Sequence, residues 1–252
     1  MTNARTAADQ LRAARLGRTP RTPFTDGDPT LGEEWGYRVQ DLDRADRLAI
    51  GEVLVGAKLG LTSRAKQRTM GVHQPVIGFL TDVMLIGAGT DPLGGTAQPR
   101  IEPEIAFRLA HDLDGPDTIE GAVDAVAVAA EIIDSRFAGF DYRLADVLAD
   151  NTSAAGFALG PWVSPAAAGD LATAACAFWA DDRLIHTATG AAILGHPLRA
   201  LIQLAEHLAE RSERLAAGSV VLAGALTDAI PLHTGMTYRV EFDGLGALEL
   251  TP

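Results

Sequence analysis

Residues 100–109 read RIEPEIAFRL, which is the sharpest local pattern in the chain. In a β-strand, alternate side chains face opposite sides, so Ile105 and Phe107 would enter a core on one side. Glu102 and Glu104 would then project together from the other side. Two carboxylates on one face of a strand repel each other unless positive charge lies between them. The pair therefore indicates either a solvated sheet face or a site that holds a cation.

A third glutamate, Glu131, interrupts an apolar run at residues 125–133. Burying a carboxylate in such surroundings is costly unless it is paired or coordinates a metal. The alternative is a helix whose polar stripe reaches the surface at Glu131. If Glu102, Glu104 and Glu131 converge, their oxygens form a hard ligand set that suits Mg²⁺ or Mn²⁺ better than Zn²⁺.

Lys58 lies in the glycine-rich apolar segment GEVLVGAKLGL at 51–61. A partly buried lysine near carboxylates or an anionic substrate is a candidate acid, base or electrostatic anchor. The alternative is a lysine at the end of a strand, whose stem is buried while its ammonium group reaches solvent.

Three more residues are candidates for contacts with a substrate. Ser153 closes the polar run DNTS at 150–153, which either caps a turn or grips a carboxylate. Thr227 follows a strand pattern and would lie at the mouth of a site. His73 is the histidine that falls in a candidate site loop at 71–75. The six histidines show no metal-ligand spacing, and the phosphate-binding loop and the serine-hydrolase elbow are absent.

The spacing of apolar residues predicts the other elements. We expect helices over 1–16, 33–50, 64–70 and 198–208, a helix leading into a strand over 121–133, a hairpin over 174–188, and strands over 51–61, 76–86, 99–109, 219–226, 236–242 and 247–250. Residues 17–32 are rich in Pro and Gly and predict a loop or arm. The fold class is α+β, with an N-terminal helical region (1–55) and a β-rich catalytic domain (56–252) that form one compact unit. The sheet is expected to be curled or barrel-like, with helices outside.

Composition limits the class of protein. The 252 residues are 47% hydrophobic with a net charge of −12, and 21 Lys+Arg are scattered among 33 Asp+Glu. The chain can bury a full core but shows no basic face for nucleic acid. No apolar run approaches the ~20 residues of a membrane span, and residues 1–18 lack the apolar segment of a signal peptide. The single cysteine, Cys176, cannot form a disulfide within the chain and sits in an apolar run. We expect a cytoplasmic protein in which Cys176 is buried.

Long stretches of the chain resemble the 2-oxopent-4-enoate hydratase / 4-oxalocrotonate decarboxylase family, a branch of the fumarylacetoacetate hydrolase superfamily. The matching stretches are GYRVQ (36–40), GAKLGLTSRAKQRTMGVHQPVIGFLTD (56–82), PRIEPEIAF (99–107), AAEIIDSRF (129–137), LADNTSAAGFALG (148–160), LGHPL (194–198) and the block at 215–250. They occur in the family's order and cover nearly the whole chain after residue 35.

The resemblance implies a mixed β-sandwich roll of the fumarylacetoacetate hydrolase type with an N-terminal helical region. It implies one Mg²⁺ or Mn²⁺ held at Glu102, Glu104 and Glu131, with the family's lysine at Lys58 and its polar-loop serine at Ser153. The implied reaction is metal-dependent decarboxylation of a small anionic 2-oxo acid, a 2-oxo-3-enedioate of the 4-oxalocrotonate type. The product is 2-hydroxypenta-2,4-dienoate, in aromatic-compound catabolism. In this hypothesis Lys58 orients the distal carboxylate or handles a proton, and Ser153 and Thr227 hydrogen-bond the substrate.

Two other functions stay open. One is a hydratase that adds water to 2-hydroxypenta-2,4-dienoate or to a longer 2-oxo-enoate. Hydratases of the family often carry an acidic residue after the Gln-Pro pair, where this chain has Val76, and this difference favours the decarboxylase. The other is a non-catalytic partner of a sister enzyme. The resemblance also suggests homo-oligomers and pairing with a sister hydratase or decarboxylase. The arm at 17–32 is a candidate contact, and a disordered arm is the alternative.

Overall fold

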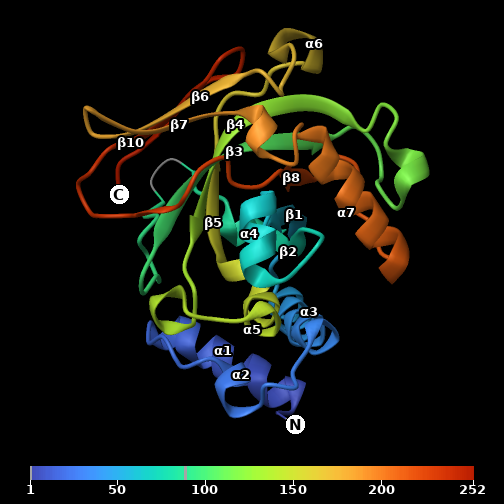
Figure 1. Ribbon diagram of the computed structural model, residues 1–252, viewed down its shortest axis with the longest axis vertical. Helices are drawn as coiled ribbons and strands as arrows, with labels where there is room; N and C mark the ends of the chain where they lie inside the picture. The colour runs from blue at the N-terminus through green and yellow to red at the C-terminus, as the bar shows by residue number, and fades with distance from the viewer. Residues whose placement is uncertain (1, 88–89) are drawn as a thin grey trace.

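Figure 1 shows the computed structural model, which describes residues 2–87 and 90–252 apart from the side chains of Lys66 and Thr69. The helices within residues 4–49 gather at one end of the molecule, and the strands within residues 175–189 and 238–242 lie at the other. The helices are α1 (Ala4–Gly17), α2 (Phe24–Gly27), α3 (Glu33–Ala49), α4 (Arg64–Met70), α5 (Leu144–Ala149), α6 (Pro165–Ala168) and α7 (Leu198–Arg211). Short 3₁₀ turns are η1 (Asp82–Met84), η2 (Pro116–Thr118), η3 (Ala138–Phe140), η4 (Asn151–Ser153) and η5 (Gly190–Ala192).

The strands of the described residues form two sheets. The larger contains β1 (Leu54–Gly60), β2 (Val76–Thr81), β3 (Arg100–Leu109), β4 (Val123–Ile133), β5 (Ala154–Leu159), β8 (Val220–Leu222) and β9 (Ile230–Pro231). Its order is β2-β1-β8-β3-β4-β5, with β9 paired to β3, and the β1–β8 pair is parallel while the others are antiparallel. The smaller sheet has the order β11-β10-β6-β7 and contains β6 (Ala175–Ala180), β7 (Arg183–Thr189), β10 (Tyr238–Phe242) and β11 (Gly246–Leu250). The predicted α+β class is confirmed.

β3 lies inside the larger sheet and alternates as predicted. Ile105 and Phe107 are fully buried in the main core, which also contains Phe178 of the second sheet. Ala106, which lies between them in the sequence, packs in a different cluster on the opposite face with Phe157. Each large apolar side chain that is fully buried contributes about 1.5–3 kcal/mol, so the core fixes which face of β3 carries the glutamates.

The expected helix at the start of 121–133 is wrong, because Val123–Ile133 is one continuous strand, β4. From Ala125 to Ile133 every residue is buried. A strand that is covered on both faces has no polar alternation, and a run of Ala and Val without alternation is ambiguous between helix and strand. The pairing of β4 with both β3 and β5 decides the conformation here, not local propensity.

The segment at 17–32 is packed against the body of the protein, so the alternative of a disordered arm is wrong. Phe24 is 5% exposed and packs edge-on to the rings of Trp35 and Phe137. The Asp146 carboxylate accepts hydrogen bonds from the backbone N–H groups of Phe24 and Thr25 at 2.8 and 3.2 Å. The segment therefore joins the N-terminal helices to α5.

The other elements agree with expectation except at some ends. The hairpin β6–β7, helix α7 and helix α4 form where predicted, and Cys176 is buried. The strands expected over 76–86 and 219–226 are shorter, ending at Thr81 and Leu222. Gly224 has a φ of 109°, which turns the chain away from the sheet. Within the described residues, no helix has the length and apolar character needed to cross a membrane.

A network of ion pairs joins α3 to the end of α7. Arg44 donates to both carboxylate oxygens of Glu213 at 2.9 Å, and Arg211 pairs with Asp41 at 2.7 Å. The hydrogen bonds from Arg44 lower the pKa of Glu213 from 4.5 to about 2. A carboxyl group whose pKa is depressed on folding stabilises the protein above its ordinary pKa, and that stability is lost as the pH falls toward the depressed value.

We expect Glu213→Gln to lower the free energy of unfolding at pH 7 by about 1 kcal/mol, a small value because the pair is partly exposed. The difference from the wild type should shrink as the pH falls from 4.5 toward 2. Urea unfolding at pH 7 and pH 3 measures this difference in the free energy of unfolding. Glu34→Gln is the control, because the Glu34 carboxylate is 90% exposed. An equal difference at both pH values would contradict the ion-pair explanation.

Candidate metal centre and cavity

The strand register brings three glutamates together. In the antiparallel β3–β4 pair, Glu102 lies directly opposite Glu131, and Glu104 follows two residues later on the same face of β3. Residues directly opposite across an antiparallel pair have neighbouring side chains, and like charges in that position are destabilising. The backbone therefore holds together three groups that repel one another when ionised.

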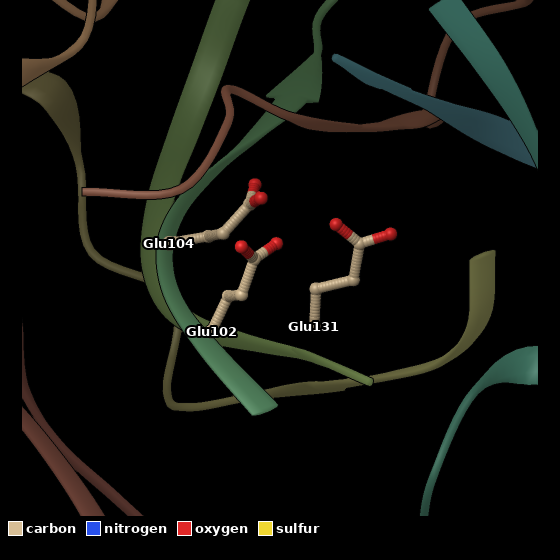
Figure 2. Close-up of side chains that lie close together, drawn as sticks. All are labelled: Glu102, Glu104 and Glu131. Atoms are coloured by element: carbon tan, nitrogen blue, oxygen red, sulfur yellow. The ribbon is translucent and has the colours of Figure 1, made fainter. Parts of the chain in front are cut away.

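These carboxyl groups are buried and point toward the same space (Figure 2). Glu104 and Glu131 are 0% exposed and Glu102 is 8% exposed, and one carboxylate oxygen from each lies within 4.8 Å of the others. Glu104 Oε2 accepts a hydrogen bond from the N–H of Gly224 at 2.8 Å. Among the described residues, Glu104 Oε1 and Glu131 Oε2 have no hydrogen-bond donor. Buried carboxylate oxygens without donors are costly, and a cation that bound them would remove this cost.

Lys58 supplies one positive charge to the cluster. Its Nζ lies 3.1 Å from Glu131 Oε1 and donates to the carbonyl oxygen of Thr152 at 3.2 Å. Lys58 is 3% exposed and projects from β1, where its neighbours across the sheet are Gly78 and Leu222. The alternative of a lysine whose ammonium reaches solvent is therefore wrong.

The polar run at 150–153 forms a strained turn beside Lys58. Asn151, Thr152 and Ser153 have φ angles of 47°, 52° and 63°, in the left-handed region that residues other than glycine rarely adopt. The Asn151 side chain accepts from the N–H of Phe79 at 2.9 Å and donates to its carbonyl at 3.0 Å, as a neighbouring strand would. A Cβ on Gly78 would lie 2.5 Å from Thr152 Oγ1, so glycine lets the turn sit against β2.

Burial and mutual repulsion shift the titration of the cluster. Burial raises the pKa of Glu131 to about 7, although the Lys58 charge opposes the rise. Burial, reinforced by the charge of Glu131, raises the pKa of Glu104 well above its ordinary range. For Lys58, burial lowers the pKa, but the charges of the three glutamates outweigh it and the pKa is raised. Glu104 and Glu131 are therefore both fully ionised near neutral pH only when more positive charge is close.

The residues fit a divalent cation. Three carboxylates and one ammonium group carry a net charge of −2, which one divalent ion balances. All the ligand atoms are carboxylate oxygens, as Mg²⁺ and Mn²⁺ prefer. The ion would also supply the missing partner of Glu104 Oε1 and Glu131 Oε2. Ion binding thus accounts for both the burial and the unsatisfied oxygens.

A cavity of about 630 Å³ opens onto this cluster. It is lined by Lys58, Leu59, Gly60, Leu61, Thr62, Ala65, Met70, Val76, Arg100, Glu102, Ile133, Phe140, Asp141, Tyr142, Val147, Thr152, Ser153, Ala225, Asp228 and Ala229. This volume suits a small-molecule ligand. The lining mixes apolar side chains, such as Val76, with polar ones, and Glu102 and Lys58 bring the charged cluster to the cavity wall.

Of the residues proposed from the sequence, Lys58, Glu102 and Ser153 line the cavity, and Glu104 and Glu131 adjoin Glu102. Two others line hollows other than this cavity. His73 lines a separate hollow of about 360 Å³ with Arg64 and Arg199. Thr227 lines an adjoining hollow of about 310 Å³, which shares Ala225 and Asp228 with the main cavity, and its hydroxyl donates to the carbonyl of Asp228 at 3.2 Å.

Three other residues line the cavity but were not predicted from the sequence: Arg100, Phe140 and Tyr142. Arg100 precedes Glu102 by two positions on β3, so strand alternation alone could have placed it on the same face. Phe140 and Tyr142 lie in and just after η3, between β4 and α5. No periodic pattern marks such residues, so they become visible only in the folded chain.

No protein-family model matches the chain. Among characterised proteins it is similar to a 4-oxalocrotonate decarboxylase of a Pseudomonas species, with 41% identity over 91% of each chain. It is also similar to a 2-keto-4-pentenoate hydratase of Burkholderia vietnamiensis, with 37% identity over 97% of this chain and 95% of that one. Decarboxylases and hydratases therefore resemble this chain to a comparable degree.

Among solved structures, 4-oxalocrotonate decarboxylase from Pseudomonas putida G7, complexed with magnesium and adipate, superposes with a TM-score of 0.92 at 32% identity. The match covers 98% of this chain and 96% of that chain. A fumarylacetoacetate hydrolase family protein from Yersinia pestis CO92 shares the fold alone, with a TM-score of 0.57 at 16% identity over 77% of this chain and 91% of that chain. The predicted fold type is confirmed.

Proposed function

Because this chain belongs to the family of 4-oxalocrotonate decarboxylases and 2-keto-4-pentenoate hydratases, we propose that it decarboxylates a 2-oxo-3-enedioate to 2-hydroxypenta-2,4-dienoate. The observation that carries the proposal is the buried cluster of Glu102, Glu104 and Glu131, with the Lys58 ammonium 3.1 Å from Glu131, at the end of a cavity of suitable size. The expected role in aromatic-compound catabolism, the cytoplasmic location and the homo-oligomeric assembly stay predictions from the sequence.

Glu102, Glu104 and Glu131 would hold one Mg²⁺ or Mn²⁺. When bound, the ion supplies a Lewis acid that withdraws electrons from the 2-oxo group of the substrate. The β3–β4 register fixes the spacing of the three carboxylates before any ion arrives, so little reorganisation accompanies binding. The relative from Pseudomonas putida G7, which was solved with magnesium, supports this assignment.

Lys58 would hold the proton that the reaction consumes. Loss of CO₂ from the distal carboxylate leaves an electron pair that moves through the conjugated system toward the 2-oxo oxygen, and that oxygen must gain a proton to give the 2-hydroxy product. The Lys58 Nζ lies at the glutamate end of the cavity, close to where this oxygen would be. The Thr152 carbonyl and Glu131 orient the ammonium group. The Ser153 hydroxyl, on the cavity wall, would hydrogen-bond the substrate.

The wall around Val76 favours decarboxylation over hydration. Val76 is 4% exposed and lines the cavity with the apolar side chains of Leu61 and Met70. A hydratase must activate a water molecule beside the carbon chain of its substrate, and a valine cannot accept a proton from water. The similarity to a 2-keto-4-pentenoate hydratase keeps hydration as the second candidate function.

An assay with Mg²⁺ and each substrate in turn separates the two functions. We expect one bicarbonate to be released for each 2-oxo-3-enedioate consumed, and chelation of the metal should stop the reaction. Loss of the 2-hydroxypenta-2,4-dienoate absorbance without release of CO₂ would show a hydratase instead. Metal binding with neither reaction would favour a non-catalytic partner of a sister enzyme and contradict the proposal.

A further inference from the structure

Arg100 is a second cation in the cavity, and the proposed chemistry does not use it. It begins β3 two residues before Glu102, so its side chain leaves the same face of the strand. Among the described residues that line the cavity, Lys58 and Arg100 are the cations. Lys58 is paired with Glu131, whereas the Arg100 guanidinium has no carboxylate partner in the part of the chain that the structure describes. A half-buried guanidinium without an anion is ready to bind one.

The Phe140 ring holds Arg100 in place, with the guanidinium carbon 4.1 Å from the ring centroid. A planar guanidinium stacked on an aromatic face keeps its N–H edge available for a carboxylate. Phe140 has a φ of 61° and follows Gly139, which has a φ of 68°. This strained backbone is held by Gln98, whose side chain donates to the carbonyls of Ser135 and Phe137 and accepts from the N–H of Gly139. The loop is therefore built to present the ring to Arg100.

The charge of the cavity requires such a group. Three glutamates, Lys58 and one divalent ion sum to zero, and Asp141 and Asp228 also line the cavity, so these groups offer a dianionic substrate no excess of positive charge. The protein as a whole carries a net charge of −12, which disfavours a dianion. Lys58 is 3% exposed and engaged at the glutamate end, so among the lining residues that the structure describes Arg100 is the cation available to the distal end of the ligand.

We propose that Arg100, stacked on Phe140, binds the distal carboxylate and selects dicarboxylic over monocarboxylic 2-oxo acids. This inference rests on the proposed function only in taking the 2-oxo acid end of the ligand to lie at the glutamate cluster. In this proposal Arg100, and not Lys58, binds the distal carboxylate of the substrate. Lys58 keeps the role of proton donor.

Two unreactive ligands test the proposal without turnover. Both 2-oxoadipate and 2-oxohexanoate present the same 2-oxo acid, lack the double bond that decarboxylation needs, and differ in the distal carboxylate. In calorimetric titrations with Mg²⁺ present, the wild type should bind 2-oxoadipate more tightly. Arg100→Gln should weaken 2-oxoadipate binding about 10- to 100-fold, as expected for charge-assisted hydrogen bonds, and leave 2-oxohexanoate within about twofold. Phe140→Leu should weaken 2-oxoadipate by about two- to fivefold.

Arg108→Gln is the matched control, because Arg108 lies on the same strand and pairs with Asp124 at the surface. It should leave the affinity for both ligands unchanged. Equal losses for both ligands in Arg100→Gln, or no loss for either, would overturn the proposal. So would a wild type that shows no preference. A wild type that prefers 2-oxoadipate through Arg100 but releases no CO₂ from the enedioate would refute the proposed reaction alone and leave this inference standing.

Discussion

Glu104→Gln should abolish turnover, lowering kcat by at least about 10³-fold, while the protein stays folded. The side chain is fully buried, and the substitution keeps its shape and an oxygen that can accept from the N–H of Gly224. It removes one of the three negative charges that would hold the cation. A Lewis acid contributes several kcal/mol to a reaction that builds charge on a carbonyl oxygen, and each 1.4 kcal/mol is a factor of ten in rate. Steady-state kinetics with saturating substrate measures the loss.

Thermal unfolding with and without metal shows whether the loss arises at the metal. At about 100 times the dissociation constant, a bound ion stabilises the folded state by about 2.7 kcal/mol. Mg²⁺ or Mn²⁺ should therefore raise the Tm of the wild type but not that of Glu104→Gln. Without metal the variant should be at least as stable as the wild type, because one repelling carboxylate is gone. Glu249→Gln, at an exposed strand position, should behave as the wild type in every assay. Unchanged turnover in Glu104→Gln would remove Glu104 from the site.

The sequence predicted all three members of the glutamate cluster, each with an alternative: a solvated sheet face for Glu102 and Glu104, and the surface of a helix for Glu131. Glu102 and Glu104 lie in a strand whose alternating pattern is clear, so their shared face follows from period two. The proposed identity of Glu131 as a third member depended on whether residues 121–133 formed a strand. Its neighbours are Ala and Val on both faces, a pattern that suits a buried strand or a helix. The pairing of Glu131 with Glu102 depends on the register between β3 and β4, which the pattern within one strand does not reveal.

The positions of Thr227 and His73 could not be predicted for a different reason. Both residues follow places where the chain changes direction. Thr227 comes after Gly224, whose φ of 109° diverts the chain out of β8, and His73 comes after Gly71, with a φ of 68°. Alternation along a strand or helix stops at such a turn, so the direction of the next side chain depends on the packing of the loop. Arg100, inside β3, was within reach of the same reasoning that found Glu102.

The polar residues at 150–153 were predicted either to cap a turn or to grip a carboxylate, and these two roles do not exclude each other. Residues held in the left-handed region cost about 1–3 kcal/mol each and persist where their surroundings fix them. Asn151 is fixed by its two hydrogen bonds to Phe79, and Asp150 by its buried ion pair with Arg136. The result is that the Thr152 carbonyl meets Lys58 and Ser153 lines the cavity. The hydrogen bonds that fix the turn therefore also place the Thr152 carbonyl and Ser153 at the site.

Lys58→Met should separate turnover from metal binding, in contrast to Glu104→Gln. Methionine fills the buried space but carries no proton, so kcat should fall about 10²- to 10⁴-fold, the usual contribution of a positioned acid or base. Because the substitution removes the charge 3.1 Å from Glu131, Mn²⁺ should bind as tightly as in the wild type or more tightly. The metal-free variant would bury uncompensated carboxylates at a cost of about 3–5 kcal/mol, so the assays need saturating metal.

Lys58→Arg then distinguishes a proton donor from a simple counter-charge. Arginine keeps the positive charge beside Glu131, but it does not give up its proton near neutral pH. If Lys58 transfers a proton to the substrate oxygen, Lys58→Arg should bind metal and 2-oxoadipate yet remain as slow as Lys58→Met. Recovery of turnover in Lys58→Arg would mean that the charge alone suffices, and a Lys58→Met variant within about threefold of the wild-type kcat would leave Lys58 with a purely structural role. Since Lys58 is 3% exposed and lines the cavity, we expect its proton to be replaced through the cavity after each turnover, once the product has left.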